Sequence, residues 1–127
     1  MVKLTWDLFD EAVEQIARSV HGVTAVHGIP RGGLPLAVAL SHRLGVPMSV
    51  PGEGGVLVLD DIRDSGETLK PYDARGDLVW TWVGRLDGRG NAVIRSDAWI
   101  IFPWEVPDNA HQELSAYMNK REVGRGQ

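Results

Sequence analysis

The sequence contains no cysteine among its 127 residues. Disulfides, thiol catalysis and thiolate metal sites are therefore excluded. A strong basic charge is also missing, because 17 acidic residues outnumber 13 basic ones and give a formal net charge of -4. Since counterion release from a broad basic surface drives nucleic-acid binding, we expect no nucleic-acid partner. Any anionic ligand must then be held locally, by backbone amides, a metal ion or a few cations.

Long hydrophobic runs are equally scarce. The first ten residues carry no positive leader followed by an apolar stretch, and no segment approaches the roughly 18 apolar residues of a membrane span. We therefore expect a cytoplasmic protein without a membrane partner. With 127 residues, of which 43% are hydrophobic, the chain fits one folded domain over residues 1–127.

Hydrophobic spacing in the first half of the chain predicts alternating helices and strands. Thr5 is the predicted cap of an amphipathic helix that extends to Val20. The β-branched run Val23–Ile29 predicts a strand, and Leu34–Leu44 predicts a helix that stops at glycine. Val56–Leu59 lies between glycines and acids, which is typical of a strand buried on both faces of a parallel sheet.

The second half continues the alternation. After Thr68 we expect a short helix that Pro71 limits, then strands at Leu78–Val83 and Ala98–Phe102, and a closing helix at Asn109–Glu122. Strands that alternate with helices predict an α/β fold with a mostly parallel sheet flanked by helices.

Two glycine-bearing turns are the candidate ligand site, because each follows a predicted strand and precedes a predicted helix. The first is Pro30-Arg31-Gly32-Gly33, and the second is Asp64-Ser65-Gly66-Glu67-Thr68. Neither matches a Walker A loop or a G-x-G-x-x-G fingerprint, which disfavours nucleoside triphosphates and dinucleotides as ligands.

The acids before the second turn indicate a sugar phosphate. Burying the adjacent carboxylates of Asp60 and Asp61 is costly unless hydroxyls or a cation meet them, and a ribose diol with Mg²⁺ supplies both. The amides that follow, with the hydroxyls of Ser65 and Thr68 at the predicted helix start, would form a cradle for a 5′-phosphate.

The run Val56–Thr68 closely resembles the phosphoribosyl pyrophosphate motif of type I phosphoribosyltransferases. The segments Leu4–Asp7, Pro30–Gly33 and Asp97–Glu105 are similar to those of bacterial and archaeal xanthine-guanine phosphoribosyltransferases and their hypoxanthine-using relatives. The resemblance implies the type I fold and a role in purine salvage. The implied reaction transfers the phosphoribosyl group from the Mg²⁺ complex of phosphoribosyl pyrophosphate to guanine, xanthine or hypoxanthine.

The resemblance also assigns the donor site residue by residue. It implies that the sugar phosphate is bound by Asp60, Asp61, Asp64, Ser65, Gly66, Glu67 and Thr68, and that Asp60 and Asp61 also hold Mg²⁺. Asp64 matches the residue proposed in the family as the catalytic base. Pro30, Arg31, Gly32 and Gly33 match the pyrophosphate loop, in which the peptide before the arginine position is often cis.

The purine contacts follow from the same resemblance. Trp99 followed by Ile100 matches the aromatic and aliphatic pair that stacks on the purine. Arg85 stands where the family usually has a lysine that donates to the purine 6-oxygen, and a guanidinium can donate there as well. For the other tryptophans of this half we expect packing in a core or an interface: Trp80, Trp82 and Trp104.

One departure from the family is large. Between Val46 and Val56 the family normally carries another strand and a long mobile loop that closes over the site, whereas this chain has only Pro47–Gly55. A shortened lid leaves the site more open to water, so donor hydrolysis beside transfer is one expectation. A cover supplied by a second subunit of a homo-oligomer is another.

Two alternatives to the purine enzyme stay open. A regulatory or non-catalytic module that binds phosphoribosyl pyrophosphate or nucleotides would explain the short lid, and a transferase for another base would share the same donor site. The joint presence of Asp64, Arg85 and Trp99 favours the enzyme, because a sensor of the sugar phosphate alone needs none of them.

Overall fold

The computed structural model describes residues 1–52, 54–106, 114 and 116–118. The chain divides into two compact units, of which the first comprises Met1–Phe9 and Ala98–Gln127 and the second comprises Asp10–Asp97. The single domain expected from the chain length stays a prediction.

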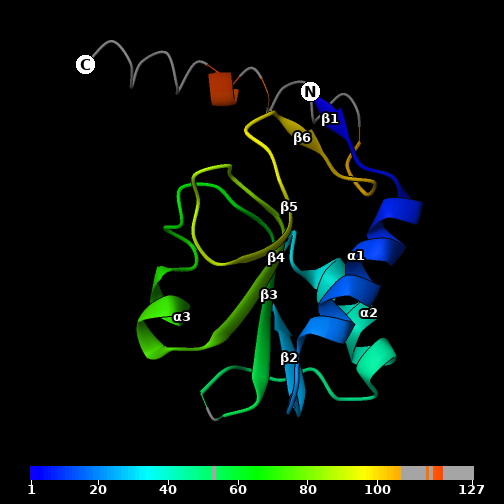
Figure 1. Cartoon of the computed structure of the whole chain (residues 1–127), viewed down its shortest axis with the longest axis vertical. Coiled ribbons are helices and arrows are strands. Elements are labelled where there is room, and N and C mark those ends of the chain that lie inside the picture. The colour runs from blue at the N-terminus through cyan, green and yellow to red at the C-terminus, as the bar shows by residue number, and fades with distance from the viewer. Residues whose placement is uncertain (53, 107–113, 115, 119–127) are drawn as a thin grey trace. The chain divides into compact units, whose positions relative to one another are not determined.

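Four parallel strands form the sheet of the second unit, in the order β2-β3-β4-β5. Their bounds are Ala25–Gly28 for β2, Val56–Arg63 for β3, Leu78–Gly84 for β4 and Asn91–Arg95 for β5. Figure 1 shows α2, which spans Leu34–Leu44, and α3, which spans Lys70–Arg75, to either side of these strands. This arrangement confirms the predicted α/β class with a parallel sheet flanked by helices.

Two helices begin or end where the sequence predicts. The first helix, α1, spans Trp6–Ser19, and the amide of Leu8 donates to the Thr5 hydroxyl at 3.2 Å, which confirms the N-cap. Helix α2 stops at Gly45, whose φ of 68° lies in the left-handed region that glycine adopts readily.

The expected effect of Pro71 is wrong. Pro71 lies in the first turn of α3, where a missing amide hydrogen costs no helical hydrogen bond, and the helix continues to Arg75. Gly76, with a φ of 77°, ends it instead. The proline therefore marks the beginning of this helix and not its limit.

The strand β3 is longer than the apolar run that predicts it. Asp60, Ile62 and Arg63 continue the pairing with β4, so the acids lie inside the strand and not after it. The three residues Leu57, Val58 and Leu59 are completely buried, which confirms a strand covered on both faces.

The C-terminal expectations are met in part. The sequence did not predict β5, whose only local signals are Gly90 before it and the pair Val93-Ile94 within it. The strand expected at Ala98–Phe102 is reduced to β6, Ile100–Ile101, which pairs in parallel with β1, Val2–Lys3, in the first unit. Most of the predicted helix Asn109–Glu122 lies outside the described residues, although residues 114 and 116–118 within it are helical.

No helix among the described residues combines the length and the apolar character that crossing a membrane requires.

Two glycines bring the start of α2 close to the sheet. A Cβ atom on Gly28 would lie 2.7 Å from the Cβ of Ala37, and one on Gly33 would overlap the carbonyl oxygen of Leu59 and lie 2.8 Å from the amide nitrogen of Ile29. The turn between β2 and α2 therefore packs on the backbone of β3 at a distance that only glycine permits.

We expect Gly33→Ala to lower the free energy of unfolding by on the order of 3 kcal/mol, because the added methyl group meets backbone atoms that cannot move aside. Urea unfolding measures this change. Gly54→Ala is the matched control, since a Cβ atom added there would have no neighbour within 4 Å, and it should stay within about 0.5 kcal/mol of the parent. Equal stability of both variants would contradict the packing of Gly33 on β3.

Candidate active site

A pocket of about 210 Å³ lies where β3 ends and the chain turns toward α3. Of the residues that the motif predicts for the sugar phosphate, all but Glu67 line this pocket. The complete lining is Asp60, Asp61, Ile62, Arg63, Asp64, Ser65, Gly66, Thr68 and Leu69. The carboxyl end of a parallel strand is where open α/β sheets bind ligands.

Two neighbouring carboxyl groups, those of Asp60 and Asp61, line this pocket. Asp60 is 7% exposed, and its Oδ1 accepts the amide hydrogen of Asp61 at 2.9 Å. The Oδ1 of Asp61 accepts the amide hydrogen of Ile62 at 2.8 Å. Burial, together with the hydrogen bond and the charge of the adjacent Asp61 carboxyl, raises the pKa of Asp60 to about 8. At neutral pH the pair therefore holds a proton that a cation would displace.

The acid pair fits a metal ion that arrives with its ligand. Among the described residues, no group of three or more histidine, cysteine, aspartate or glutamate side chains is placed to hold a metal. Mg²⁺ in phosphate-transfer sites commonly takes only one or two protein carboxylates and completes its shell with substrate phosphates and water. Asp60 and Asp61 supply that number.

The first glycine turn meets the acid pair. A Cβ atom on Gly32 would overlap the Asp61 carboxyl group, with Oδ1 2.7 Å away, so the loop backbone lies directly against that side chain. The peptide bond between Pro30 and Arg31 is cis, as the resemblance implies, and the Arg31 side chain is exposed. The structure thus places the Pro30–Gly33 loop and the acids of β3 in one site.

The second turn differs from its expected geometry. Residues 64–69 form bends and turns, and α3 begins only at Lys70, so Ser65 and Thr68 are not at a helix start. Gly66 has a φ of 83°, and the amide of Glu67 donates to the Ser65 hydroxyl at 3.3 Å. Any phosphate bound here would be held by the amides and hydroxyls of the turn.

A small hydrophobic cluster anchors both turns. Leu69, which follows the second turn, is 1% exposed and packs with Ile29, which precedes the first. Val58 of β3 and Val79 of β4 complete the cluster. The two loops therefore start or end in the same part of the core.

Arg85 and Asp64, both predicted from the resemblance, are in direct contact. Arg85 follows β4 and is 8% exposed. Its Nε donates to Asp64 Oδ1 at 3.0 Å, and its Nη1 donates to the carbonyl oxygen of Ser96 at 2.9 Å. The candidate purine contact and the candidate base therefore form an ion pair.

The other predicted purine contacts belong to the first unit. The ring of Trp99 lies 4.9 Å from that of Tyr117 at an interplanar angle of 44°, and its Nε1 is buried with no hydrogen-bond partner among the described residues. Ile100 is buried in β6 beside Val2 of β1. In the same unit Trp104 stacks on Phe102, in line with a packing role.

Arg63, the last residue of β3, also lines the pocket. It is buried, and its Nη1 and Nη2 donate to the two carboxylate oxygens of Asp73 at 2.6 and 3.0 Å. These hydrogen bonds lower the pKa of Asp73. No local sequence pattern predicts this contact, because it forms only when α3 packs beside β3.

The short connection from α2 to β3 lies away from this pocket. Met48 forms an isolated parallel bridge with Val26 at the edge of β2. Gly55 lines a separate hollow together with Leu78, the first residue of β4. The described part of residues 47–55 therefore runs along the amino ends of the strands, at the opposite end of the sheet from the acid pair.

The geometry can be compared with known proteins. No known family profile matches the chain, and no curated protein matches it. A purine phosphoribosyltransferase from Pyrococcus horikoshii has a similar structure, with a TM-score of 0.71 and 28% identity over 83% of this chain and 94% of that one. The Helicobacter pylori xanthine-guanine-hypoxanthine phosphoribosyltransferase has a TM-score of 0.66 and 20% identity over 88% and 98% of the two chains. A hypothetical protein from Neisseria gonorrhoeae, solved with bound ppGpp, has a TM-score of 0.62 and 18% identity over 91% and 97%.

These similarities confirm the resemblance found in the sequence. The chain has the type I phosphoribosyltransferase fold and is similar to the purine enzymes that carry it.

We expect Asp60→Asn to stabilise the metal-free protein increasingly as pH rises from 5 to 8. An acid whose pKa is raised in the folded state keeps its proton there while the unfolded chain loses it, so the parent loses stability over this range and the asparagine variant does not. The advantage should grow by at most about 1.4 kcal/mol per pH unit. Urea unfolding at several pH values measures it, with the exposed Asp87→Asn as control. A gain that does not change with pH would contradict a protonated Asp60.

Proposed function

We propose that the chain transfers the 5-phosphoribosyl group from phosphoribosyl pyrophosphate to a purine base, namely guanine, xanthine or hypoxanthine, and releases pyrophosphate. The observation that carries this proposal is the pair formed by the buried Asp60 and by Asp61, whose carboxyl group lies against Gly32, shortly before the turn at residues 64–68. The similarity to the purine enzyme of Pyrococcus horikoshii supports it.

The donor would be held along this line of groups. The carboxylates of Asp60 and Asp61 accept hydrogen bonds from the ribose hydroxyls, and the amides and hydroxyls of residues 64–68 bind the 5′-phosphate. Pyrophosphate lies against the Pro30–Gly33 loop, where glycine amides approach it closely and Arg31 adds a positive charge.

Asp60 and Asp61 would also hold Mg²⁺. When bound, the ion neutralises charge on the departing pyrophosphate. Because Asp60 is protonated at neutral pH in the free protein, it gives up that proton when the donor complex binds.

The purine is the nucleophile. The bond between the anomeric carbon and pyrophosphate breaks with oxocarbenium character, while a purine ring nitrogen forms the new bond to that carbon. Asp64 takes the proton that this nitrogen loses, and Arg85, whose Nε donates to Asp64 Oδ1, holds that carboxylate in place. The resemblance further implies that Arg85 donates to the 6-oxygen and that Trp99 with Ile100 stacks on the ring.

A nucleotide-binding module without turnover is the second candidate. The described part of residues 47–55 lies at the opposite end of the sheet and provides no cover for the pocket. The Neisseria gonorrhoeae protein of the same fold was solved with ppGpp bound. A transferase for a base other than a 6-oxopurine would share the donor site and differ in the purine contacts.

The deciding experiment adds the Mg²⁺ complex of phosphoribosyl pyrophosphate to the protein. At 100 times its dissociation constant the donor should stabilise the fold by about 2.7 kcal/mol, measured as a rise in Tm. Asp61→Asn should abolish most of this rise, whereas the exposed Asp87→Asn should keep it. An unchanged Tm of the parent at millimolar donor would refute the donor site.

Turnover separates the candidates once binding is established. Pyrophosphate and nucleotide are followed separately, with and without each purine. Nucleotide formation equal to pyrophosphate release supports the transferase, and pyrophosphate release without purine indicates a site open to water. Binding without either product supports the module. If pyrophosphate release equals nucleotide formation only at high protein concentration, a second copy of the chain covers the site.

We expect Trp99→Ala to raise KM for all three purines by an amount equivalent to about 1–3 kcal/mol, the usual contribution of an aromatic stacking platform, and to leave donor binding unchanged. Arg85→Met should likewise affect all three, because they share the 6-oxygen. Trp104→Phe is the control within the same unit, since Trp104 packs on Phe102. Loss of folding in Trp99→Ala, or a defect confined to one purine in Arg85→Met, would speak against these roles.

A further inference from the structure

The connection between β4 and β5 is unusually short for parallel strands. β4 ends at Gly84 and β5 begins at Asn91, yet the two strands pair in parallel, with Trp80 opposite Asn91 and Gly84 opposite Arg95. Parallel neighbours normally need a crossover of a dozen or more residues. Residues 85–90 must therefore turn back along the sheet without a helix, which leaves their carbonyl groups without strand partners.

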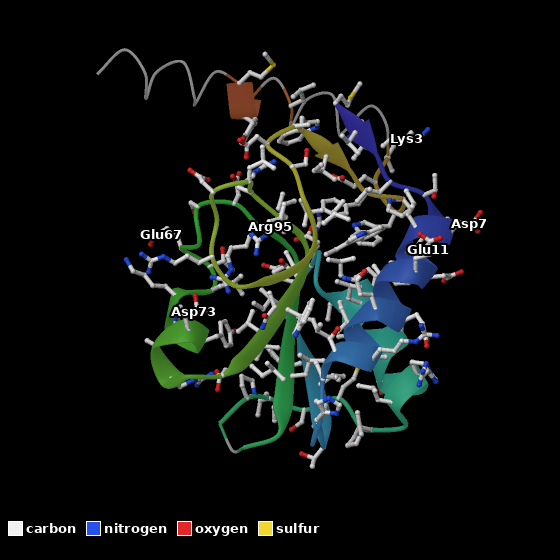
Figure 2. All side chains as sticks on the ribbon, in the orientation of Figure 1. Lys3, Asp7, Glu11, Glu67, Asp73 and Arg95 are labelled. Atoms are coloured by element: carbon white, nitrogen blue, oxygen red, sulfur yellow. The ribbon has the colours of Figure 1, made fainter. Side chains whose placement is uncertain are left out.

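Arg95 supplies partners for these carbonyl groups. Its Nη1 donates to the carbonyl oxygens of Arg85 at 3.2 Å and Gly88 at 3.3 Å, and its Nη2 donates to that of Gly90 at 2.5 Å. To reach them the side chain crosses Gly84, where a Cβ atom would lie 2.9 Å from Nη1. In Figure 2 the labelled Arg95 lies within the loop that joins β4 to β5.

Arg63 contacts the same loop from β3. A Cβ atom on Gly90 would lie 2.9 Å from Arg63 Nε and 3.0 Å from its Nη2, so the guanidinium group packs against the Gly90 backbone. The ion pair with Asp73 of α3 fixes that group in turn. Gly90 therefore contacts two arginines that come from different strands.

The position of Arg85 depends on this arrangement. Its main-chain carbonyl accepts hydrogen bonds from Arg95 and from the amide of Gly88, and its side chain donates to Asp64 and to the carbonyl of Ser96. Ser96 follows Arg95 directly, and its amide donates to the carbonyl of Gly84 at 2.9 Å. The Arg95 guanidinium group thus helps to fix the backbone from which Arg85 reaches the candidate base, together with Asp97, whose Oδ1 accepts the amide hydrogen of Leu86 at 3.0 Å.

We infer that Arg95 is a positioning residue for purine recognition, which acts by fixing the 85–90 loop and through it the Arg85 side chain. This inference rests on the proposed function. A lysine could not replace Arg95, because a single ammonium group on a flexible stem lacks the planar fork that reaches three carbonyl oxygens at once.

The test compares purine-dependent and purine-independent binding. Calorimetry measures the Kd of guanosine 5′-monophosphate and of ribose 5-phosphate for the parent, Arg95→Met and Arg89→Met. Arg89 is exposed in the same loop, so its substitution removes the same charge without the three hydrogen bonds. We expect Arg95→Met to raise the Kd of the nucleotide about tenfold, equivalent to about 1.4 kcal/mol, with the Kd of ribose 5-phosphate unchanged. Arg89→Met should change neither.

A double-mutant cycle distinguishes positioning from general stabilisation. If Arg95 acts through Arg85, then Arg95→Met should add little to the nucleotide defect of Arg85→Met, whereas independent contributions would add in full. Arg95→Lys serves if Arg95→Met does not fold, and it should show the same selective loss.

The outcomes separate the two claims. A parent protein that binds neither ligand overturns the proposed function, and this inference with it. A parent that binds both, with an Arg95 variant that binds the nucleotide as the parent does, overturns the role of Arg95 alone. Equal weakening of both ligands, or full additivity with Arg85→Met, also overturns it.

Discussion

The packing of Ile29 against Leu69 is the contact on which the candidate site depends. Ile29 enters the first glycine turn, Leu69 leaves the second, and Val58, which packs with both, lies two residues before Asp60. Burial of one apolar cluster therefore brings both loops and the acid pair to the same end of the sheet. Hydrogen bonds within each loop, such as that from the Gly33 amide to the Ile29 carbonyl oxygen at 2.8 Å, join near neighbours in the chain, so the apolar core determines where the two loops lie relative to each other.

The acid pair is a local conflict that the fold tolerates. A carboxyl group that is 7% exposed in the middle of a strand, beside a second carboxyl group, keeps its proton instead of its charge. Such violations of ordinary packing rules are expected where a ligand completes the site. The Asp61 carboxyl group also needs a special neighbour, because only a glycine at position 32 leaves room for it.

The parts of this structure that sequence could predict are those with local signals. The cap at Thr5, the stop at Gly45 and the apolar run before Asp60 each depend on neighbours in the chain, and the motif at residues 60–68 predicts the candidate site. The remaining parts depend on register. Contacts such as Arg85 with Asp64 form only once β3 and β4 are aligned, and the pairing of β5 depends on a loop whose partners are side chains from two strands. The expectation for Pro71 was wrong because proline is common both in the first turn of a helix and just after the end of one.

The bridge between Met48 and Val26 has a consequence for how this fold can change in length. It lies on the outer edge of β2, which has no other strand beside it in the four-stranded sheet of the described residues. An insertion between α2 and β3 would extend the pairing that the bridge begins, and so add a fifth strand without disturbing β3 or the residues after it. The bridge between Met48 and Val26 is therefore the position at which a longer segment between α2 and β3 could pair with β2.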